Sequence, residues 1–139
     1  MKRQITLFVV LVSFALILSA CGNAGESSGL EPVPSDYAGI TNPFVGDAET
    51  IAAGQVIYAS RCASCHGETG MGDGPASASL DPKPSRLGDV VKEAGADYLY
   101  WRIAEGGIQS PFNSSMPAHK SVLSQDEIWQ VVTFLQSME

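Results

Sequence analysis

Apolar residues recur at steps of three and four positions in several segments, which is the spacing of one face of an α-helix. The clearest case lies near the C-terminus and comprises Ile128, Val131, Val132, Leu135 and Met138. Directly before it, Ser124 and Glu127 form an S-x-x-E capping box, with Leu123 and Ile128 placed for a hydrophobic staple. The sequence therefore predicts a helix that begins after Ser124.

Three further segments have helical punctuation. They are about Ala48 to Ser60 after an Asp47 cap, RLGDVVKEA between Ser85 and Gly95, and YLYWRIAE between Asp97 and Gly106. No segment alternates convincingly as a β-strand. We therefore expect an all-α domain with long irregular loops, the longest from Gly67 to Pro84.

The first twenty residues form a separate apolar segment. Lys2 and Arg3 precede an almost wholly apolar run from Ile5 to Leu18, which is the layout of a secretory signal. The tetrad LSAC resembles the bacterial lipobox, which implies cleavage before Cys21 and lipidation of that cysteine. A transmembrane anchor is the alternative, but the run has about 14 residues and a spanning helix needs about 20. We expect residues 1–20 to be removed and acylated Cys21 to anchor an exported protein at the outer face of the cytoplasmic membrane, on the periplasmic side or at the cell surface.

The rest of the chain divides into two parts. Residues 21–47 are rich in Gly, Ser, Pro and acidic side chains and show no sustained periodicity, so they are predicted to be the lipid anchor and a flexible linker. Residues 48–139 form one small domain. A domain of this size is only marginally stable on hydrophobic burial alone, and it would gain from a staple or a prosthetic group.

The charge of the chain narrows the possible partners. The sequence contains 8 basic and 15 acidic side chains, a formal net charge of −7. Removal of the signal takes Lys2 and Arg3 and no acid, so the mature chain would carry −9. This charge argues against nucleic acid and against a second, electrostatic attachment to anionic lipid. It is compatible with a basic partner, and equally with solubility alone.

Two of the three cysteines and one of the two histidines stand together in Cys62-Ala63-Ser64-Cys65-His66. Residues three apart on a helical turn share a face, so both sulfurs would reach one planar group. C-x-x-C-H is the attachment pattern of c-type haem. The pattern predicts thioether bonds from Cys62 and Cys65 and an iron–imidazole bond from His66.

Three alternatives compete with covalent haem. A thioredoxin-like C-x-x-C expects a βαβ setting, and no strands are predicted. A structural zinc site needs four ligands, and beyond the motif only Cys21 and His119 are soft or imidazole donors. A plain disulfide would leave His66 without a role and would close too small a loop to stabilise much. In an exported chain the motif favours one haem c, which would also add apolar surface to a small core.

The second axial ligand of the iron has several candidates, namely Met71, Met116, Met138 and His119. Met71 is only five residues from His66, and Met138 belongs to the apolar face of the last helix. Met116 stands in the loop NSSMPAHK, outside any apolar periodicity. We expect Met116, because Met/His ligation is the cytochrome c arrangement and raises the reduction potential. His119, in bis-histidine ligation, is the alternative, although a solvent-facing loop histidine is its simpler interpretation.

With Cys62, Cys65, His66 and Met116 in place, residues 48–139 resemble a monohaem class I cytochrome c. The stretch AAGQVIYASRCASCHG is similar to the N-terminal helix of that family. The resemblance implies that this helix crosses the one in LSQDEIWQVVTFLQS, with Gly54, Tyr58, Trp129 and Phe134 as candidate contacts.

Two loops carry the resemblance further. GDGPA is similar to the loop whose proline carbonyl accepts a hydrogen bond from the axial histidine, a part that would fall to Pro75. MPAH is similar to the axial methionine segment, although an aromatic residue is commoner at position 119. Arg102 and Lys120 are candidates for contacts with the haem propionates.

The resemblance implies the cytochrome c fold, about four short helices wrapped around one covalent haem, and a one-electron carrier rather than an enzyme. It extends, less specifically, to small lipoprotein cytochromes of respiratory assemblies, such as the monohaem subunit of alternative complex III. We expect redox protein partners at the membrane, bilayer contact through acylated Cys21, no nucleic acid and no small-molecule substrate. The alternatives are a haem subunit fixed within a larger membrane redox complex, or a haem enzyme or gas sensor with an open sixth position.

Overall fold

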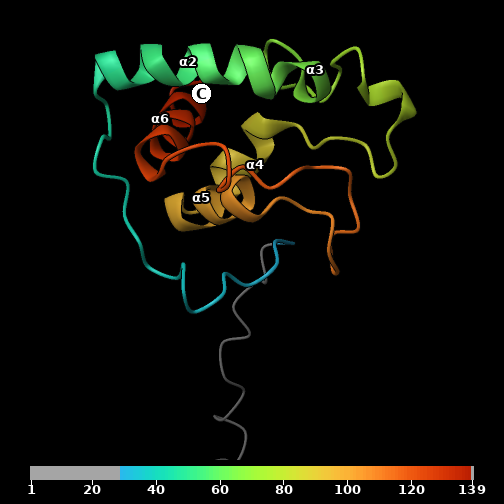
Figure 1. The fold of residues 1–139 in the computed structure, drawn as a ribbon, viewed down its shortest axis with the longest axis horizontal. Coiled ribbons are helices and arrows are strands. Elements are labelled where there is room, and N and C mark those ends of the chain that lie inside the picture. The colour runs from blue at the N-terminus through green and yellow to red at the C-terminus, as the bar shows by residue number, and fades with distance from the viewer. Residues whose placement is uncertain (1–28, 139) are drawn as a thin grey trace, which may run out of the picture.

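A computed structural model describes residues 29–138, so the predicted signal and Cys21 lie outside the described residues. Within them the chain forms helices joined by loops, without a strand (Figure 1). The helices are α2 (Ala48–Arg61), α3 (Ala63–His66), η1, a 3-10 turn (Ser77–Ser79), α4 (Leu87–Glu93), α5 (Ala96–Glu105) and α6 (Gln125–Gln136). The all-α prediction is confirmed for this part of the chain, and none of its helices is long and apolar enough to cross a membrane.

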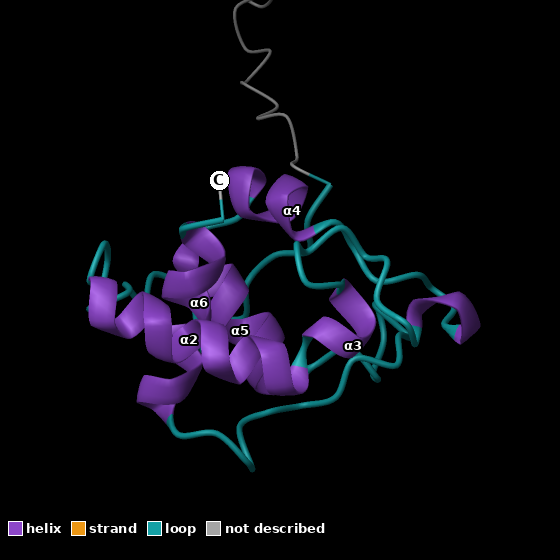
Figure 2. Ribbon diagram, turned by 90° about the horizontal axis from the view of Figure 1, so that it is seen from above, coloured by secondary structure: helices purple, strands orange, loops and turns teal. Residues whose placement is uncertain are grey.

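The first and last long helices, α2 and α6, pack across each other (Figures 1 and 2). Gly54 lies at the crossing, where an added Cβ would come within 2.0 Å of the Gln130 carbonyl oxygen. One turn later, buried Tyr58 places its ring 5.2 Å from the ring of Phe134. The expected contact of Phe134 is therefore confirmed, and α6 occupies the space that a side chain at position 54 would need.

The caps predicted at Asp47 and Ser124 are present, whereas α4 has Arg86 rather than Ser85 at its N-cap position. The Asp47 carboxylate accepts a hydrogen bond from the backbone N–H of Thr50 at 2.7 Å. Ser124 Oγ accepts from the Glu127 N–H at 3.2 Å, and Glu127 Oε2 accepts from the Ser124 N–H at 2.7 Å. The capping box is confirmed, and it starts α6 at the residue that the sequence indicated.

Helix α5 begins two residues earlier than predicted, at Ala96, with Gly95 at the N-cap position. Asp97, the predicted cap, lies inside the first turn. Its carboxylate accepts hydrogen bonds from the backbone N–H groups of Tyr98 at 2.8 Å and Gly39 at 2.9 Å. The side chain therefore connects α5 to a distant part of the chain instead of capping the helix.

The core lies between α5 and α6 and is closed on one side by α2. Its buried apolar residues are Tyr58, Leu99, Tyr100, Ile103, Ala104, Leu123, Ile128, Trp129, Val131, Val132 and Leu135. Trp129, the other residue expected at the α2–α6 crossing, packs against Tyr100 of α5, with ring centroids 4.4 Å apart and the ring planes tilted by 42°. Aromatic contacts therefore connect all three helices.

Residues 34–47, which we call the strap, run over α5 and α6 before α2 begins (Figure 1). Tyr37, Ile40 and Phe44 are partly buried against the core. The Asn42 amide donates to Thr133 Oγ1 at 3.0 Å and to Gln136 Oε1 at 2.9 Å. These specific contacts differ from the flexible linker predicted for residues 21–47. Composition alone indicated a linker because the three apolar anchors are too widely spaced to form a periodic pattern.

Candidate functional site

The motif residues lie where α2 passes into α3. The backbone N–H of Cys62 still bonds to Tyr58 O of α2, at 2.8 Å, while those of Cys65 and His66 bond to Cys62 O at 3.1 and 2.9 Å. Cys62, Cys65 and His66 therefore belong to one helical turn, and both cysteines are free thiols. Tyr58 fixes the end of this turn, because its hydroxyl donates to Gly67 O at 2.6 Å.

The GDGPA loop packs directly on this turn. The backbone N–H of Gly74 donates to Cys65 O at 3.2 Å, and that of Ala76 donates to Ser64 O at 2.9 Å. An added Cβ at Gly74 would lie 2.4 Å from Ser64 O, so only glycine allows this approach. The loop thus supports the backbone of the motif turn through these two hydrogen bonds.

The imidazole of His66 faces a different carbonyl from the expected one. Its Nδ1 lies 3.3 Å from the carbonyl oxygen of Ser85, and the described residues include no hydrogen bond from His66 to Pro75. Burial lowers the pKa of His66, so the ring is neutral at neutral pH. A neutral imidazole with one nitrogen directed at a carbonyl keeps its other nitrogen available as a metal ligand.

The thiol environment is also apolar. Burial raises the pKa of Cys62 to about 11, so this thiol is not an activated thiolate. Redox-active or nucleophilic cysteines have lowered pKa values and electropositive surroundings. The geometry therefore disfavours the thioredoxin-like alternative for the C-x-x-C pair.

Met116 is held by the backbone that follows α5. The N–H of Gly107 donates to Met116 O at 2.9 Å, and the N–H of Ser114 donates to Gly107 O at 2.7 Å. Gly106 has φ +69°, and an added Cβ would lie 2.6 Å from Met116 O and 2.5 Å from Pro117 C. The sequence marked Gly106 only as a helix end. The double glycine in AEGG was the available sign that another segment lies close against it.

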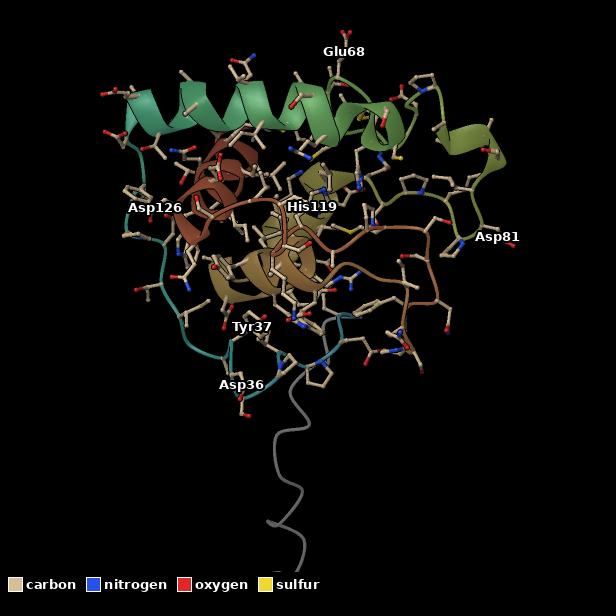
Figure 3. All side chains as sticks on the ribbon, viewed as in Figure 1. Asp36, Tyr37, Glu68, Asp81, His119 and Asp126 are labelled. Atoms are coloured by element: carbon tan, nitrogen blue, oxygen red, sulfur yellow. The ribbon has the colours of Figure 1, made fainter. Side chains whose placement is uncertain are left out.

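His119 is buried, with only 7% of its surface exposed, so the interpretation as a solvent-facing histidine is wrong. Its backbone N–H bonds to the carbonyls of Ile103 and Ala104 at the end of α5, both at 3.1 Å, which draws the residue inward. Figure 3 shows it in the interior of the domain. Burial lowers the pKa of His119, and its Nδ1 has no hydrogen-bond partner among the described residues.

One cavity of about 280 Å³ joins these segments. Cys62, Cys65 and His66 contribute to its lining from the motif, and Ser115, Met116 and His119 contribute from the loop between α5 and α6. Apolar side chains from four helices complete it, among them Tyr58, Leu87, Val90, Ile103, Val131 and Leu135.

This lining fits a haem group. Cys62, Cys65, His66 and Met116 bring two free thiols, one imidazole and one thioether to the border of a largely apolar space, and His119 borders the same space. Among residues 29–138, no group of three or more His, Cys, Asp or Glu side chains is arranged to hold a separate metal ion. A flat apolar ring with a metal at its centre matches this donor set, since thiols can bond to its edge and imidazole and thioether can bind its metal.

Of the two propionate candidates, only Arg102 lines the cavity. Its guanidinium carbon lies 3.3 Å from the ring centroid of Phe112, and its Nη1 donates to Gly106 O at 2.5 Å. Lys120 instead pairs with Glu105, with 2.7 Å between Nζ and Oε2.

Residues 49–135 match the protein-family model described as cytochrome C oxidase, cbb3-type, subunit III. The chain is similar to one chain of the reducing HAO-like protein complex of Kuenenia stuttgartiensis, with 28% sequence identity and a TM-score of 0.59. That match covers 79% of this chain and 52% of the other, so this chain spans about half the length of that relative.

A second solved structure shares the fold. Cytochrome CL from the marine methylotrophic bacterium Methylophaga aminisulfidivorans MPT is 22% identical, with a TM-score of 0.54 over 83% of this chain and 71% of that one. At this identity the likeness concerns the fold alone.

Proposed function

The chain belongs to the family of cytochrome C oxidase, cbb3-type, subunit III, a family of monohaem c-type cytochromes, and on this premise we propose that it is a membrane-tethered one-electron carrier with His66 and Met116 as axial ligands. Proteins of this family carry covalently bound haem c, whose iron supplies one-electron chemistry between its ferric and ferrous states. The observation that supports the assignment of residues is that the motif and Met116 border the same cavity.

Cys62 and Cys65 are assigned the thioether bonds. Both are free, both lie on the turn that starts α3, and both line the cavity. The neutral imidazole of His66 supplies one axial nitrogen. We propose a backbone carbonyl as the acceptor that orients this ring. The geometry favours the carbonyl of Ser85 as this acceptor. The resemblance favours the carbonyl of Pro75, which lies between two residues whose backbone N–H groups form hydrogen bonds to α3.

Met116 is assigned the second axial position because the Gly106–Gly107 backbone fixes its loop at the cavity. Two protein ligands keep the coordination similar in both oxidation states, which suits rapid electron transfer and leaves no position for a substrate. This arrangement favours a carrier over a haem enzyme or a gas sensor. His119 also borders the cavity and is the competing ligand.

Substitution of Met116 tests the ligation. Met116→Ala should leave the haem attached, abolish the absorption of the thioether-ligated ferric form and lower the reduction potential. Met71→Ala, which removes a methionine that is 45% exposed, is the matched control and should change neither. If His119→Ala rather than Met116→Ala alters the spectrum, the ligand is His119. Tight, immediate carbon monoxide binding to the unmutated ferrous protein would favour the enzyme or sensor.

We further propose that acylated Cys21 tethers the domain outside the cytoplasmic membrane, where it exchanges electrons with respiratory redox proteins. The LSAC tetrad and the apolar run before it support this proposal. Replacing residues 1–21 with a secretory signal that is cleaved without a lipidated cysteine should move the haem protein from the membrane fraction to the soluble extracytoplasmic fraction. If the protein still stays in the membrane, another element holds it there. Solubilising the native protein gently and identifying what co-purifies distinguishes a free carrier from a fixed subunit.

A further inference from the structure

The strap makes a contact that leads toward the methionine loop, which we define as residues 106–124. The hydroxyl of Tyr37 donates a hydrogen bond to Glu105 Oε1, and the Tyr37 ring lies 6.2 Å from the ring of Tyr100. Burial, followed by the Glu105 carboxylate, raises the pKa of Tyr37 to about 12. The phenol therefore remains a donor at any physiological pH. In Figure 3, Tyr37 lies on the strap below α5.

Glu105 is the last residue of α5, and its carboxylate also accepts from the methionine loop. Lys120 Nζ lies 2.8 Å from Glu105 Oε1 and 2.7 Å from Oε2. The backbone N–H of Lys120 also donates to Ala104 O at 3.1 Å. Lys120, and after it Tyr37, lower the pKa of Glu105, so the carboxylate is charged at neutral pH. One carboxylate thus joins the strap, the end of α5 and the segment four residues after Met116.

An exposed ion pair by itself positions little, because both side chains remain free to change rotamer. The Lys120 side chain is 58% exposed and that of Glu105 is 33% exposed. Tyr37 restricts the rotamer of Glu105, because the Tyr37 ring is packed against the core and its hydroxyl forms a hydrogen bond to one oxygen of the Glu105 carboxylate. The strap is itself fixed just after Tyr37, by the Gly39–Asp97 and Asn42–α6 hydrogen bonds.

We propose that Tyr37 is a positioning residue for Met116: through Glu105 and Lys120, the strap holds the methionine loop closed and makes the thioether harder to displace from the iron. This inference rests on the proposed role of Met116 as axial ligand. It assigns the strap a part in the redox site, which the predicted linker would not have.

The test is displacement of the thioether by added imidazole in the ferric, full-length mature protein. Tyr37→Phe removes one hydroxyl and keeps the ring. The apparent affinity for imidazole should rise by about 2- to 10-fold, the range that corresponds to one hydrogen bond. The absorption of the thioether-ligated form reports the displacement, and circular dichroism checks that the variant is folded. An unchanged affinity would overturn the proposal.

Two comparisons separate positioning from general loosening. Asp47→Ala removes the N-cap hydrogen bond of α2 and lowers stability without touching Glu105 or the contacts of Tyr37, and it should leave imidazole affinity within twofold of the unmutated protein. An equal rise in Asp47→Ala would show a nonspecific effect and overturn the inference. In a protein that already carries Lys120→Met, the further substitution Tyr37→Phe should raise the imidazole affinity only slightly. A full additional effect there would exclude transmission through Glu105 and Lys120.

Failure of the ligation itself would be recognisable. If Met116 is not the ligand, Met116→Ala leaves the spectrum and the imidazole affinity unchanged, and both proposals fall. If Met116→Ala opens the iron to imidazole while Tyr37→Phe has no effect, only the positioning role of Tyr37 is wrong.

Discussion

Gly106, the residue that follows α5, has φ +69° and lies against the backbone of Met116 and Pro117. A side chain at this position would meet two obstacles, since the left-handed region is unfavourable for L-residues and the neighbouring atoms are backbone. The path of the methionine loop therefore depends on the residue type at position 106. This dependence links a helix-terminating glycine to the loop that carries Met116.

Gly106→Ala should lower the free energy of unfolding by about 2–4 kcal/mol, from strain and overpacking together. Urea denaturation checks the value. Gly88→Ala is the control, because an added Cβ in α4 has nothing within 4 Å and alanine favours a helix interior. That variant should be unchanged or more stable by up to about 1 kcal/mol. Equal destabilisation of both would contradict the explanation.

His119 is a second residue whose behaviour depends on its surroundings. Burial lowers the pKa of His119, so the unfolded chain binds a proton at this position more readily than the native state does. Stability from this group is therefore present above the unfolded pKa of about 6.5, and it is lost as the pH falls through that value toward the lower native pKa.

Replacing this side chain should change the pH dependence of folding. Between about pH 7.5 and pH 5, the unmutated protein should lose more thermal stability than His119→Phe, which has no ionisable group there. Thermal melting at several pH values measures the difference. Parallel pH profiles for the two proteins would mean that His119 keeps its ordinary pKa in the native state.

At the scale of elements, the contact between α2 and α6 brings the two ends of the domain together. The contact requires Gly54, whose missing side chain lets the carbonyl of Gln130 approach. It also positions the motif, because Tyr58 on the same helix packs on Phe134 and bonds to Gly67. A change in packing at this crossing would therefore shift the turn that carries Cys62, Cys65 and His66.

Gly54→Ala should push α2 away from α6 and lower the free energy of unfolding by about 1–3 kcal/mol, although alanine has the better helix propensity. The substitution Gln55→Ala, at an exposed position of the same helix, should stay within about 0.5 kcal/mol of the unmutated protein. Chemical denaturation of both variants is the measurement. A stabilised Gly54→Ala protein would show that the helices can part without cost.

For the whole molecule, an unfilled cavity between the helices would lower stability. Its lining includes core residues such as Ile103, Val131 and Leu135, so one surface of the core faces the cavity. At about 24 cal/mol per Å³, leaving 280 Å³ empty would cost at most about 7 kcal/mol. Small domains have only about 5–15 kcal/mol in total. A group that fills the cavity should therefore add substantially to the stability of the fold.

The double variant Cys62→Ala/Cys65→Ala tests this dependence. Without covalent haem, the chain should lose most of its cooperative thermal transition and become sensitive to proteases. Circular dichroism melting measures the loss. Met116→Ala, which should retain the haem, is the matched control and should still melt cooperatively. A sharp transition at an unchanged temperature in the double variant would show that the polypeptide is stable by itself.

The sequence by itself determined the features that depend on neighbouring residues. The Asp47 cap, the Ser124–Glu127 capping box, the four longer helices and the motif turn involve residues within a few positions of each other, so local patterns were enough to predict them. The C-x-x-C-H spacing belongs to the same class, because its chemistry is contained in one turn.

Only the tertiary structure decided the features that arise from distant segments meeting. These features involve residues that no periodicity in the sequence relates. They are the burial of His119, the contact of Ser85 with His66, the contact of Gly106 with Met116, and the hydrogen bond of Tyr37 to Glu105. Such contacts depend on which faces remain open after the helices have packed. For this reason composition predicted a flexible linker where the folded chain has a strap.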